Sequence, residues 1–407
     1  MKKFVCLLLS VSLVLGLSGC TLESQDLMEN ITQGTEAHFC NLEDQSSVFA
    51  DFSLRLFRES YEQGENTLIS PISVLYALGM TANGASGETL SQMENVFGMN
   101  LDTLNLNLMS IDKESDSLKL ANSIWFKNVP SFTVNENFLL TNANYYGAGI
   151  FKTPFDAGTC KEINDWVSEH TDGMVKNILD KIPEDAVMYL INALAFEARW
   201  EEIYMESAIR EGEFTIAQGE KRTVEMMYSE ESRYLEDSYA TGFIKYYEGG
   251  RYAFAALLPN EGISLEEYLE NLTGEELYAL LSNPCEAVVM ASIPKFKVEY
   301  DVEMSDVLKE MGMTDAFDDS AADFSGIGSS DVGNLYISRV LHKTQITVDG
   351  MGTKAGAATV VEIAPESAPG EPDFYVVNLD RPFLYMVIDT YWNMPIFMGT
   401  MIDPNLN

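Results

Sequence analysis

The distribution of helix-forming and strand-forming patterns along the chain constrains its fold more than any other feature. In the first half, apolar residues recur at helical spacing, as in residues 47–60, where Phe49, Phe52 and Leu56 fall on one helical face. From residue 186 onward, β-branched and aromatic runs bounded by turn residues predominate. Helices concentrated in one half and strands in the other predict an α+β fold rather than an alternating βαβ chain.

Individual elements can be placed from local signals. Ser70 and Pro71 are a typical N-cap and first-turn pair, and glycines separate the helix that follows from another over residues 88–97. Residues 163–179 predict a further helix, interrupted at Gly173. Strands are predicted over 186–200, 251–259, 286–300, 335–349, 372–379 and 383–389. Length alone suggests two or three domains, but no linker or repeat interrupts residues 46–407, so we expect one domain.

The N-terminal 45 residues are expected to lie outside that domain. Residues 1–19 have the charged start and short apolar centre of a secretory signal. They lead into "LSGC", which resembles the bacterial lipoprotein processing site and predicts acylation of Cys20. The alternative is an ordinary cleaved signal with a chance cysteine. Residues 20–45 are acidic, lack Lys and Arg, and predict a solvated tether to an extracellular, membrane-anchored lipoprotein on a bacterial cell surface.

Charge restricts the partners of the chain. It carries 63 acidic and 25 basic residues, for a net charge of −38. A polyanion would be repelled, so nucleic acid and anionic membrane surfaces are poor partners, and membrane contact is expected through the lipid anchor only. Beyond the signal-like residues 1–19 and Cys20, the cysteines Cys40, Cys160 and Cys285 are scattered without metal-ligand or disulfide-framework spacing, so buried or free thiols are expected.

Motifs of enzyme chemistry are lacking. "GMGTKA", residues 350–355, formally fits a dinucleotide fingerprint, but β-branched residues and prolines follow where a helix would have to begin. The three histidines are His38, His170 and His342. His342 is expected to be a hydrogen-bonded interior residue, and a hydrolase that depends on it is kept as an alternative. The sequence predicts no enzyme, no metal site and no cofactor.

Ordered blocks between Asn66 and Pro404 resemble the serpin family. They include "NTLISPISVLYALGMTANGASGETLSQM", "LINALAFEARW", "LYISRVLHKTQITVDGMGTKAGAAT" and "DRPFLYMVID", in family order. The resemblance implies a serpin domain with a large central β-sheet, further sheets, about eight or nine helices and an exposed reactive-centre loop. It also implies a monomeric, irreversible suicide-substrate inhibitor of serine proteases, whose cleaved loop inserts into the central sheet as a new strand. A non-inhibitory binding protein with the same fold is the alternative.

By this resemblance, residues 350–369 contain the reactive-centre loop. Alternate residues from Thr353 to Ile363 are small or apolar enough to be buried, whereas the charged residues fall on the other face. Fifteen residues from Gly352 to Glu366 span about 50 Å when extended. The hinge of the loop comprises Gly352, Thr353, Lys354, Ala355, Gly356, Ala357, Ala358 and Thr359.

Counting from the hinge places the reactive bond at Glu366–Ser367, which suits Glu-specific proteases with a basic pocket. The stretch that follows is about five residues longer than is usual in the family. The bond could therefore be displaced toward Ala364 or Ala368, which suits elastase-like proteases. A cationic protease would be attracted to this acidic chain.

Other family positions carry over one by one. Four residues match the shutter, the polar cluster beneath the sheet where its strands must part: Ser70, Ser73, Asn192 and His342. Trp200 matches the aromatic residue of the breach, the end of the sheet where the loop begins to insert. The chain departs from the family at Gly350 and Lys354, where acidic residues are usual, and at Gly356, where alanine is common.

Overall fold

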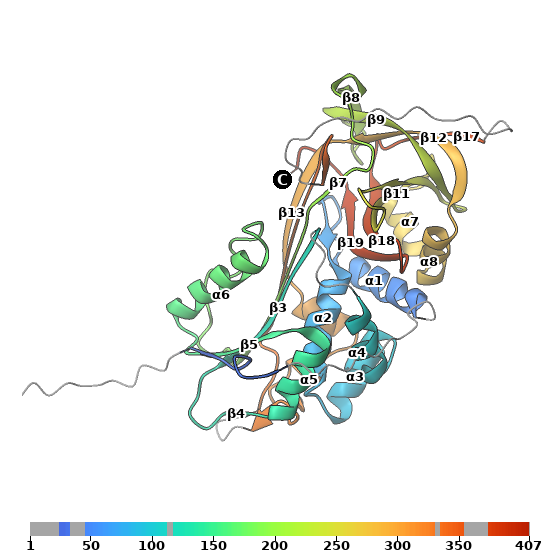
Figure 1. Cartoon of the computed structure of the whole chain (residues 1–407). Coiled ribbons are helices and arrows are strands. Elements are labelled where there is room, and N and C mark those ends of the chain that lie inside the picture. The colour runs from blue at the N-terminus through green and yellow to red at the C-terminus, as the bar shows by residue number, and fades with distance from the viewer. Residues whose placement is uncertain (1–23, 33–44, 112–116, 330–333, 354–372, 407) are drawn as a thin grey trace, which may run out of the picture.

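The computed structural model describes residues 24–32, 45–111, 117–329, 334–353 and 373–406. Within these residues the chain forms nine α-helices and three β-sheets (Figure 1). The helices are α1 (Ser46–Ser60), α2 (Pro71–Ala82), α3 (Gly87–Phe97), α4 (Leu101–Ser110), α5 (Glu136–Tyr146), α6 (Ala157–His170), α7 (Leu265–Asn271), α8 (Gly274–Ser282) and α9 (Ser305–Glu310). The predicted α+β fold in one domain is confirmed.

The first sheet, called the central sheet below, has eight strands. Their order is β1 (Gln25–Asp26), β5 (Gly149–Thr153), β3 (Leu118–Lys127), β6 (Met188–Phe196), β15 (Arg339–Val348), β16 (Gly352–Thr353) and β7 (Ala198–Arg199), with β13 (Phe296–Glu303) paired to β15. Strands β6 and β15 run parallel, from the pair Tyr189–Arg339 to the pair Ala195–Gln345. Within the described sheet, β6 is the only strand that pairs with β15 in parallel; β13 and β16 are antiparallel to it.

The second sheet has nine strands. Their order is β17 (Phe374–Asn378), β12 (Cys285–Pro294), β9 (Lys221–Glu236), β10 (Ala240–Tyr246), β11 (Tyr252–Pro259), β18 (Phe383–Asp389), β19 (Met394–Met401) and β2 (Leu68–Ile69), with β8 (Ile209–Thr215) paired to β9. A small third sheet pairs β4 (Thr133–Val134) with β14 (Gly328–Ser329). Among the described residues, strand β17 is therefore an edge strand, with β12 as its one neighbour.

The central sheet is covered on both faces, which explains the composition of β6. All nine residues of β6 are buried. Tyr189 and Ile191 join the smaller apolar cluster under α6, whereas Leu190 and Leu194 join the main core on the opposite face. Figure 1 shows α6 on one side of the sheet and α2 on the other. A strand buried on both faces has a nearly continuous apolar sequence, and "MYLINALAF" fits this rule except at Asn192.

Helix α2 lies beneath the centre of the central sheet. All twelve of its residues are buried, as expected for a helix that is apolar on every side. Its predicted start is confirmed, because Pro71 occupies the first turn and the Ser70 hydroxyl accepts a hydrogen bond from the Ser73 backbone N–H at 3.4 Å. The N-terminus of α2 therefore presents Ser70 and Ser73 to the underside of the sheet.

One helix prediction was wrong in its extent. The helix expected over residues 163–179 ends at His170, and residues 171–179 are not helical. Asp172 and Gly173 have φ angles of 50° and 74°, so two consecutive residues adopt left-handed conformations. Beyond them, the Asn164 side chain accepts hydrogen bonds from the backbone N–H groups of Ile178 and Leu179, at 2.8 and 3.1 Å. These bonds hold the segment that follows the turn against α6.

Part of the predicted solvated tether over residues 20–45 contacts the domain. Gln25 and Asp26 form β1, antiparallel to β5, and the Leu27 N–H donates to the Ile150 carbonyl at 2.9 Å. Leu27 and Ile31 are partly buried against the main core. Cys20 and the signal-like residues 1–19 lie outside the described residues. In the part of the chain that the structure describes, no helix combines the length and apolarity needed to cross a membrane.

Candidate functional site

The start of the predicted loop already occupies a place in the central sheet. Thr353 pairs with Val348 of β15 on one side and with Ala198 of β7 on the other, antiparallel to both. Strand β7 follows β6 directly along the chain. Residues 189–195 of this segment pair with β15, whereas at Ala198 strand β16 lies between the segment and β15. The sheet therefore divides at this end, and the first loop residues fill the gap.

Gly352 fits this gap because it lacks a side chain. Its φ is 152°, and a Cβ atom at this position would lie 2.2 Å from the Ala198 carbonyl oxygen. The turn that leads into β16 is held by Asp349, whose carboxylate accepts the N–H groups of Met351 and Gly352 at 2.8 and 3.3 Å. The backbone of β16 can therefore approach β7 as closely as a strand in a sheet must.

Beneath β16 lies a buried group that we call the breach cluster: Trp200, Tyr204, Glu231, Lys245, Tyr247 and Thr353. Thr353 is completely buried, and its hydroxyl is 2.7 Å from the Tyr247 hydroxyl. The Trp200 ring stacks on Tyr247 at 4.4 Å, and its indole N–H donates to the Asp349 carbonyl at 2.8 Å. Trp200 therefore contacts the turn that precedes β16.

A buried ion pair completes the breach cluster. The Lys245 ammonium lies 2.8 Å from the Glu231 carboxylate, and the two side chains are only 3% and 9% exposed. Burial raises the pKa of Glu231, while Lys245 opposes that shift. The ammonium also lies over the rings of Tyr204 and Trp200, at 4.7 and 5.4 Å from their centroids. Sequence analysis missed this pair, since acidic residues are too abundant here to mark a site.

The four residues predicted to form the shutter meet in one hydrogen-bonded cluster. Asn192 lies in β6 and His342 beside it in β15, and the imidazole Nδ1 is 2.5 Å from the Asn192 carbonyl oxygen. The same oxygen accepts the Ser73 hydroxyl at 2.7 Å, and the Asn192 amide donates to the Ser73 carbonyl. The Ser70 N–H donates to His342 Nε2 at 3.0 Å. Helix α2 is thereby tied to both of the strands that run parallel here.

His342 is held neutral. It is completely buried, and burial lowers its pKa from 6.5 to about 3. Because Nε2 accepts the Ser70 N–H, the proton of the neutral ring is on Nδ1 and points to Asn192. The Ser73 hydroxyl donates to Asn192 rather than to the imidazole, and neither Ser73 nor His342 has exposed surface. This arrangement lacks the serine–histidine bond and the access that a His342-dependent hydrolase would need.

Asn122 of β3 is a fifth polar residue of the shutter, and sequence analysis missed it. It lies opposite Asn192 in the sheet, and its carbonyl oxygen accepts the Asn192 amide at 2.9 Å. Asn122, Asn192 and His342 therefore form one polar row across three adjacent strands. An asparagine between the apolar residues of the strand "LKLANSIWFK" is the signal that could have identified it.

The structure does not reach every predicted site residue. Gly352 and Thr353 of the hinge are described, whereas Lys354–Thr359 and the reactive bond Glu366–Ser367 lie outside the described residues, as does Cys40. Cys160 and Cys285 are free thiols, the first half-buried and the second exposed.

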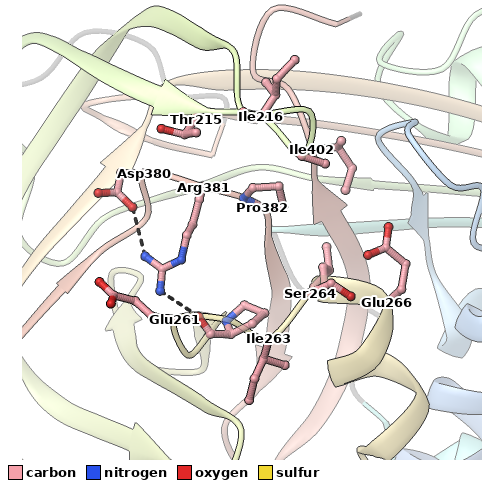
Figure 2. A pocket seen from close by; sticks show the side chains of 14 residues that line it. Thr215, Ile216, Glu261, Ile263, Ser264, Glu266, Asp380, Arg381, Pro382 and Ile402 are labelled. Atoms are coloured by element: carbon pink, nitrogen blue, oxygen red, sulfur yellow. Dashed lines mark hydrogen bonds and ion pairs between the residues drawn. The ribbon is translucent and has the colours of Figure 1, made fainter.

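A cavity of about 490 Å³ lies apart from both clusters, between the β8–β9 turn and the start of α7 (Figure 2). Ile216, Ile263 and Ile402 supply apolar walls. Its lining residues include one cation, Arg381, whose guanidinium is bound by the Asp380 carboxylate at 3.2 Å and the Pro259 carbonyl at 2.7 Å. Arg381 is thus already paired with Asp380, and the cavity offers no evident chemistry.

Comparison with known proteins identifies the family to which this chain is similar. The family model "Serpin (serine protease inhibitor)" matches residues 47–404. The horse leukocyte elastase inhibitor is 28% identical over 386 residues, which cover 89% of this chain and all of that protein.

Solved structures of the thermophilic serpin tengpin give a closer comparison. Its native state is 46% identical, with a TM-score of 0.88 over 94% of this chain and 100% of that chain. Its latent state is 45% identical, with a TM-score of 0.78 over 90% of this chain and 100% of that chain. The described fold is thus more similar to the native state. From the family match over nearly the whole domain, the chain belongs to the serpin family.

Proposed function

We propose that this protein traps serine proteases irreversibly, by cleavage of its reactive-centre loop and insertion of the loop into the central sheet. Serpins are mostly protease inhibitors, and the leukocyte elastase inhibitor is one of the relatives. The single observation that carries the proposal is the position of β16, which already lies between β15 and β7. An inserting loop would lengthen this existing strand instead of having to nucleate a new one.

The register of β16 indicates where each later residue would go. Antiparallel partners advance in opposite directions, so extension from the pairs Thr353–Val348 and Thr353–Ala198 would bring Thr359 to His342 on one side and Asn192 on the other. His342 and Asn192 are themselves partners in the present sheet. The loop would therefore enter the central sheet where the shutter holds β6 and β15 together.

The face pattern of the loop suits this path. Thr353 faces the core, so the residues that would follow it inward are Ala355, Ala357, Thr359, Val361 and Ile363. Thr359 is the one polar residue among those five, and its register would place it at the polar row of the shutter. A hydroxyl there could take over hydrogen bonds that the separated His342 and Asn192 lose.

Trapping requires no catalytic residue in this chain. The serine of the protease attacks the reactive bond, the new C-terminal peptide leaves as the amine product, and an acyl-enzyme remains on the loop. Insertion then competes with attack by water on that ester. If insertion is faster, the protease is carried along the sheet and distorted before it is released, so the outcome is decided kinetically.

Several finer assignments belong to this proposal. The reactive bond is Glu366–Ser367, and the targets are Glu-specific or elastase-like proteases, with cationic ones favoured by the net charge of −38. The protein acts as a monomer, anchored to a bacterial cell surface through acylated Cys20. These assignments rest on the sequence patterns described above.

Incubation of the purified protein with leukocyte elastase, a Glu-specific protease and a trypsin-like protease tests the proposal. We expect an SDS-resistant complex with at least one of them, and a released C-terminal peptide that begins at Ser367. Cleaved protein should also unfold at a higher temperature than intact protein, since the sheet has gained a strand. If the loop is cut by all three without a complex and without a gain in unfolding temperature, the chain is a non-inhibitory member of the family.

A further inference from the structure

An exposed apolar patch lies on the second sheet, on the strand that immediately follows the loop. Phe374 and Val376 of β17 are 64% and 58% exposed, and Met290 of β12 is 41% exposed. Met290 is the register partner of Val376, and the half-buried Val288 is the partner of Phe374. Since paired residues share a face of the sheet, these side chains form one continuous surface. We call Phe374, Val376 and Met290 the β17 patch.

No described element of the chain covers the β17 patch. Strand β17 ends the nine-stranded sheet, and the patch is on the face turned away from the buried Val289 and Val377. Contiguous exposed apolar surface of this kind typically marks an interaction site. The question is which partner would reach it.

The length of chain between the reactive bond and β17 points to the partner. Seven positions separate Ser367 from Phe374, which is at most about 25 Å of extended chain. A protease domain of roughly 230 residues is about 45 Å across. A protease that holds the reactive bond in its active site would therefore extend over β17. Displacement of the bond to Ala364 lengthens the connection to about 36 Å and leaves this conclusion unchanged.

The charges around the β17 patch indicate what kind of partner surface would be complementary to it. Glu230 lies directly opposite Met290 and is exposed, as is Asp373 before Phe374, whereas the exposed Glu286 on β12 is paired with Arg233 at 2.7 Å. An apolar centre with an acidic rim is complementary to an apolar surface flanked by basic side chains. This is the kind of surface that a cationic protease presents.

We propose that Phe374, Val376 and Met290 form a secondary docking surface for the target protease, one that carries apolar and basic side chains beside its active site. The proposal rests on the proposed function in one respect, namely that the loop is the segment a protease attacks. Binding at the patch increases the rate at which the protease reaches the loop. It leaves unchanged the later competition between insertion and hydrolysis, since the patch lies outside the central sheet.

The test compares three variants with the parent protein. The double variant Phe374→Ser/Val376→Ser removes the two patch residues of β17. Met290→Ser removes the patch residue of β12 and leaves the edge strand unchanged, so an effect that comes only from disturbing β17 can be recognised. Tyr391→Ser is the matched control, because Tyr391 is 65% exposed and lies in the turn between β18 and β19, which four strands of the sheet separate from β17. Thermal unfolding of each variant verifies that it is folded.

The readout is the second-order rate of loop attack, counted as SDS-resistant complex plus cleaved chain, with each of the three proteases that attacks the loop. The double variant should be attacked about tenfold more slowly by at least one of them, and Met290→Ser about threefold more slowly. Tyr391→Ser should stay within twofold of the parent. The fraction of attacked chains that become trapped should be the same in all four proteins.

Three results would overturn the proposal. The double variant could be attacked at the parental rate by every protease, or Tyr391→Ser could slow attack equally. Alternatively, the parent could form dimers that the double variant abolishes without any change in rate, which would make a second copy of this chain the occupant. The rate counts cleaved chain as well as complex, so the patch is tested even if the loop is cut without trapping the protease. Failure of inhibition can therefore be distinguished from failure of docking.

Discussion

The shutter and the breach cluster both place buried polar groups beneath the central sheet, but they are built differently. The shutter joins β3, β6 and β15 to α2 through neutral amide, hydroxyl and imidazole groups. The breach cluster contains stacked aromatic rings and an ion pair, Lys245–Glu231. It also includes Thr353, a residue of the loop itself. The shutter is complete without any loop residue.

This difference separates two steps of the proposed insertion. Thr353 would keep its neighbours when the loop inserts, because it already pairs with β15 and β7. The hydrogen bond between His342 and Asn192 would be lost, because the strands that carry them must separate. Breach contacts should therefore determine whether insertion can begin, and shutter contacts how readily it continues.

The largest effect is expected at Thr353, where the loop and the breach cluster meet. Thr353→Arg would place a guanidinium without a partner at a site with no exposed surface, which costs several kcal/mol. The charged side chain should keep the hinge out of the sheet, so the acyl-enzyme hydrolyses before the loop inserts. We expect the variant to be cut without forming an SDS-resistant complex.

The control for that change is one residue further along the loop. Lys354 is predicted to face outward, so Lys354→Arg should trap proteases nearly as well as the parent. Equal trapping by both variants would show that the loop does not insert in the register of β16.

A smaller effect is expected from the ion pair of the breach cluster. Lys245→Met leaves Glu231 buried without its cation, which should lower the free energy of unfolding by about 3 to 5 kcal/mol at neutral pH. Without Lys245, burial raises the pKa of Glu231 further above that of the unfolded chain. The lost stability should therefore be largest at neutral pH and should diminish as acid protonates the carboxylate.

Adding Glu231→Leu to Lys245→Met should restore most of the lost stability, since the unpaired charge is then absent. Thermal unfolding of the parent and both variants at pH 7 and pH 5 measures these differences. An unchanged midpoint for Lys245→Met would mean that the pair contributes nothing to closing this end of the sheet.

The smallest effect is expected at the shutter, as a dependence on pH. The pKa of His342 falls from 6.5 to about 3 in the folded state, so its contribution to stability is fully present above pH 6.5 and is lost as the pH falls toward 3. The slope is about 1.4 kcal/mol per pH unit, which amounts to about 2 kcal/mol between pH 7 and pH 5. His342→Gln cannot titrate and should lack this component.

The measurement is the difference in unfolding midpoint between the parent and His342→Gln, taken across that pH range on intact protein. The difference should shrink as the solution becomes more acidic. A constant difference would contradict a neutral, buried imidazole in the shutter.

Much of the fold could be predicted from the sequence because local signals and long-range order agreed. Ser70 and Pro71 marked the start of α2 through backbone geometry alone, and the alternation of the hinge indicated which face Thr353 turns to the core. The shutter residues were assigned through resemblance rather than chemistry. Ser73, Asn192 and His342 are far apart in sequence, and nothing local shows that they meet.

Other features could not be predicted because they depend on contacts across the sheets. Lys245 and Glu231 approach each other only because β9 and β10 are neighbours, and the sequence contains many acidic residues that could have been chosen. The end of α6 at His170 reflects left-handed conformations at Asp172 and Gly173, of which only the glycine gave a signal. Strand β1 has no strand-like pattern and forms because the edge of β5 is available to it.

The two outer strands of the central sheet have a consequence for solubility. An open sheet edge can recruit strands from other molecules and thereby start aggregation. On one side the sheet ends in β13, where exposed Lys297 and Glu299 are aligned in an ion pair that would hinder an incoming apolar strand. On the other side it ends in β1, whose two residues are too few to act as a template. If the loop inserts as proposed, a sheet that must accept one strand of its own is thereby protected against accepting strands from its neighbours.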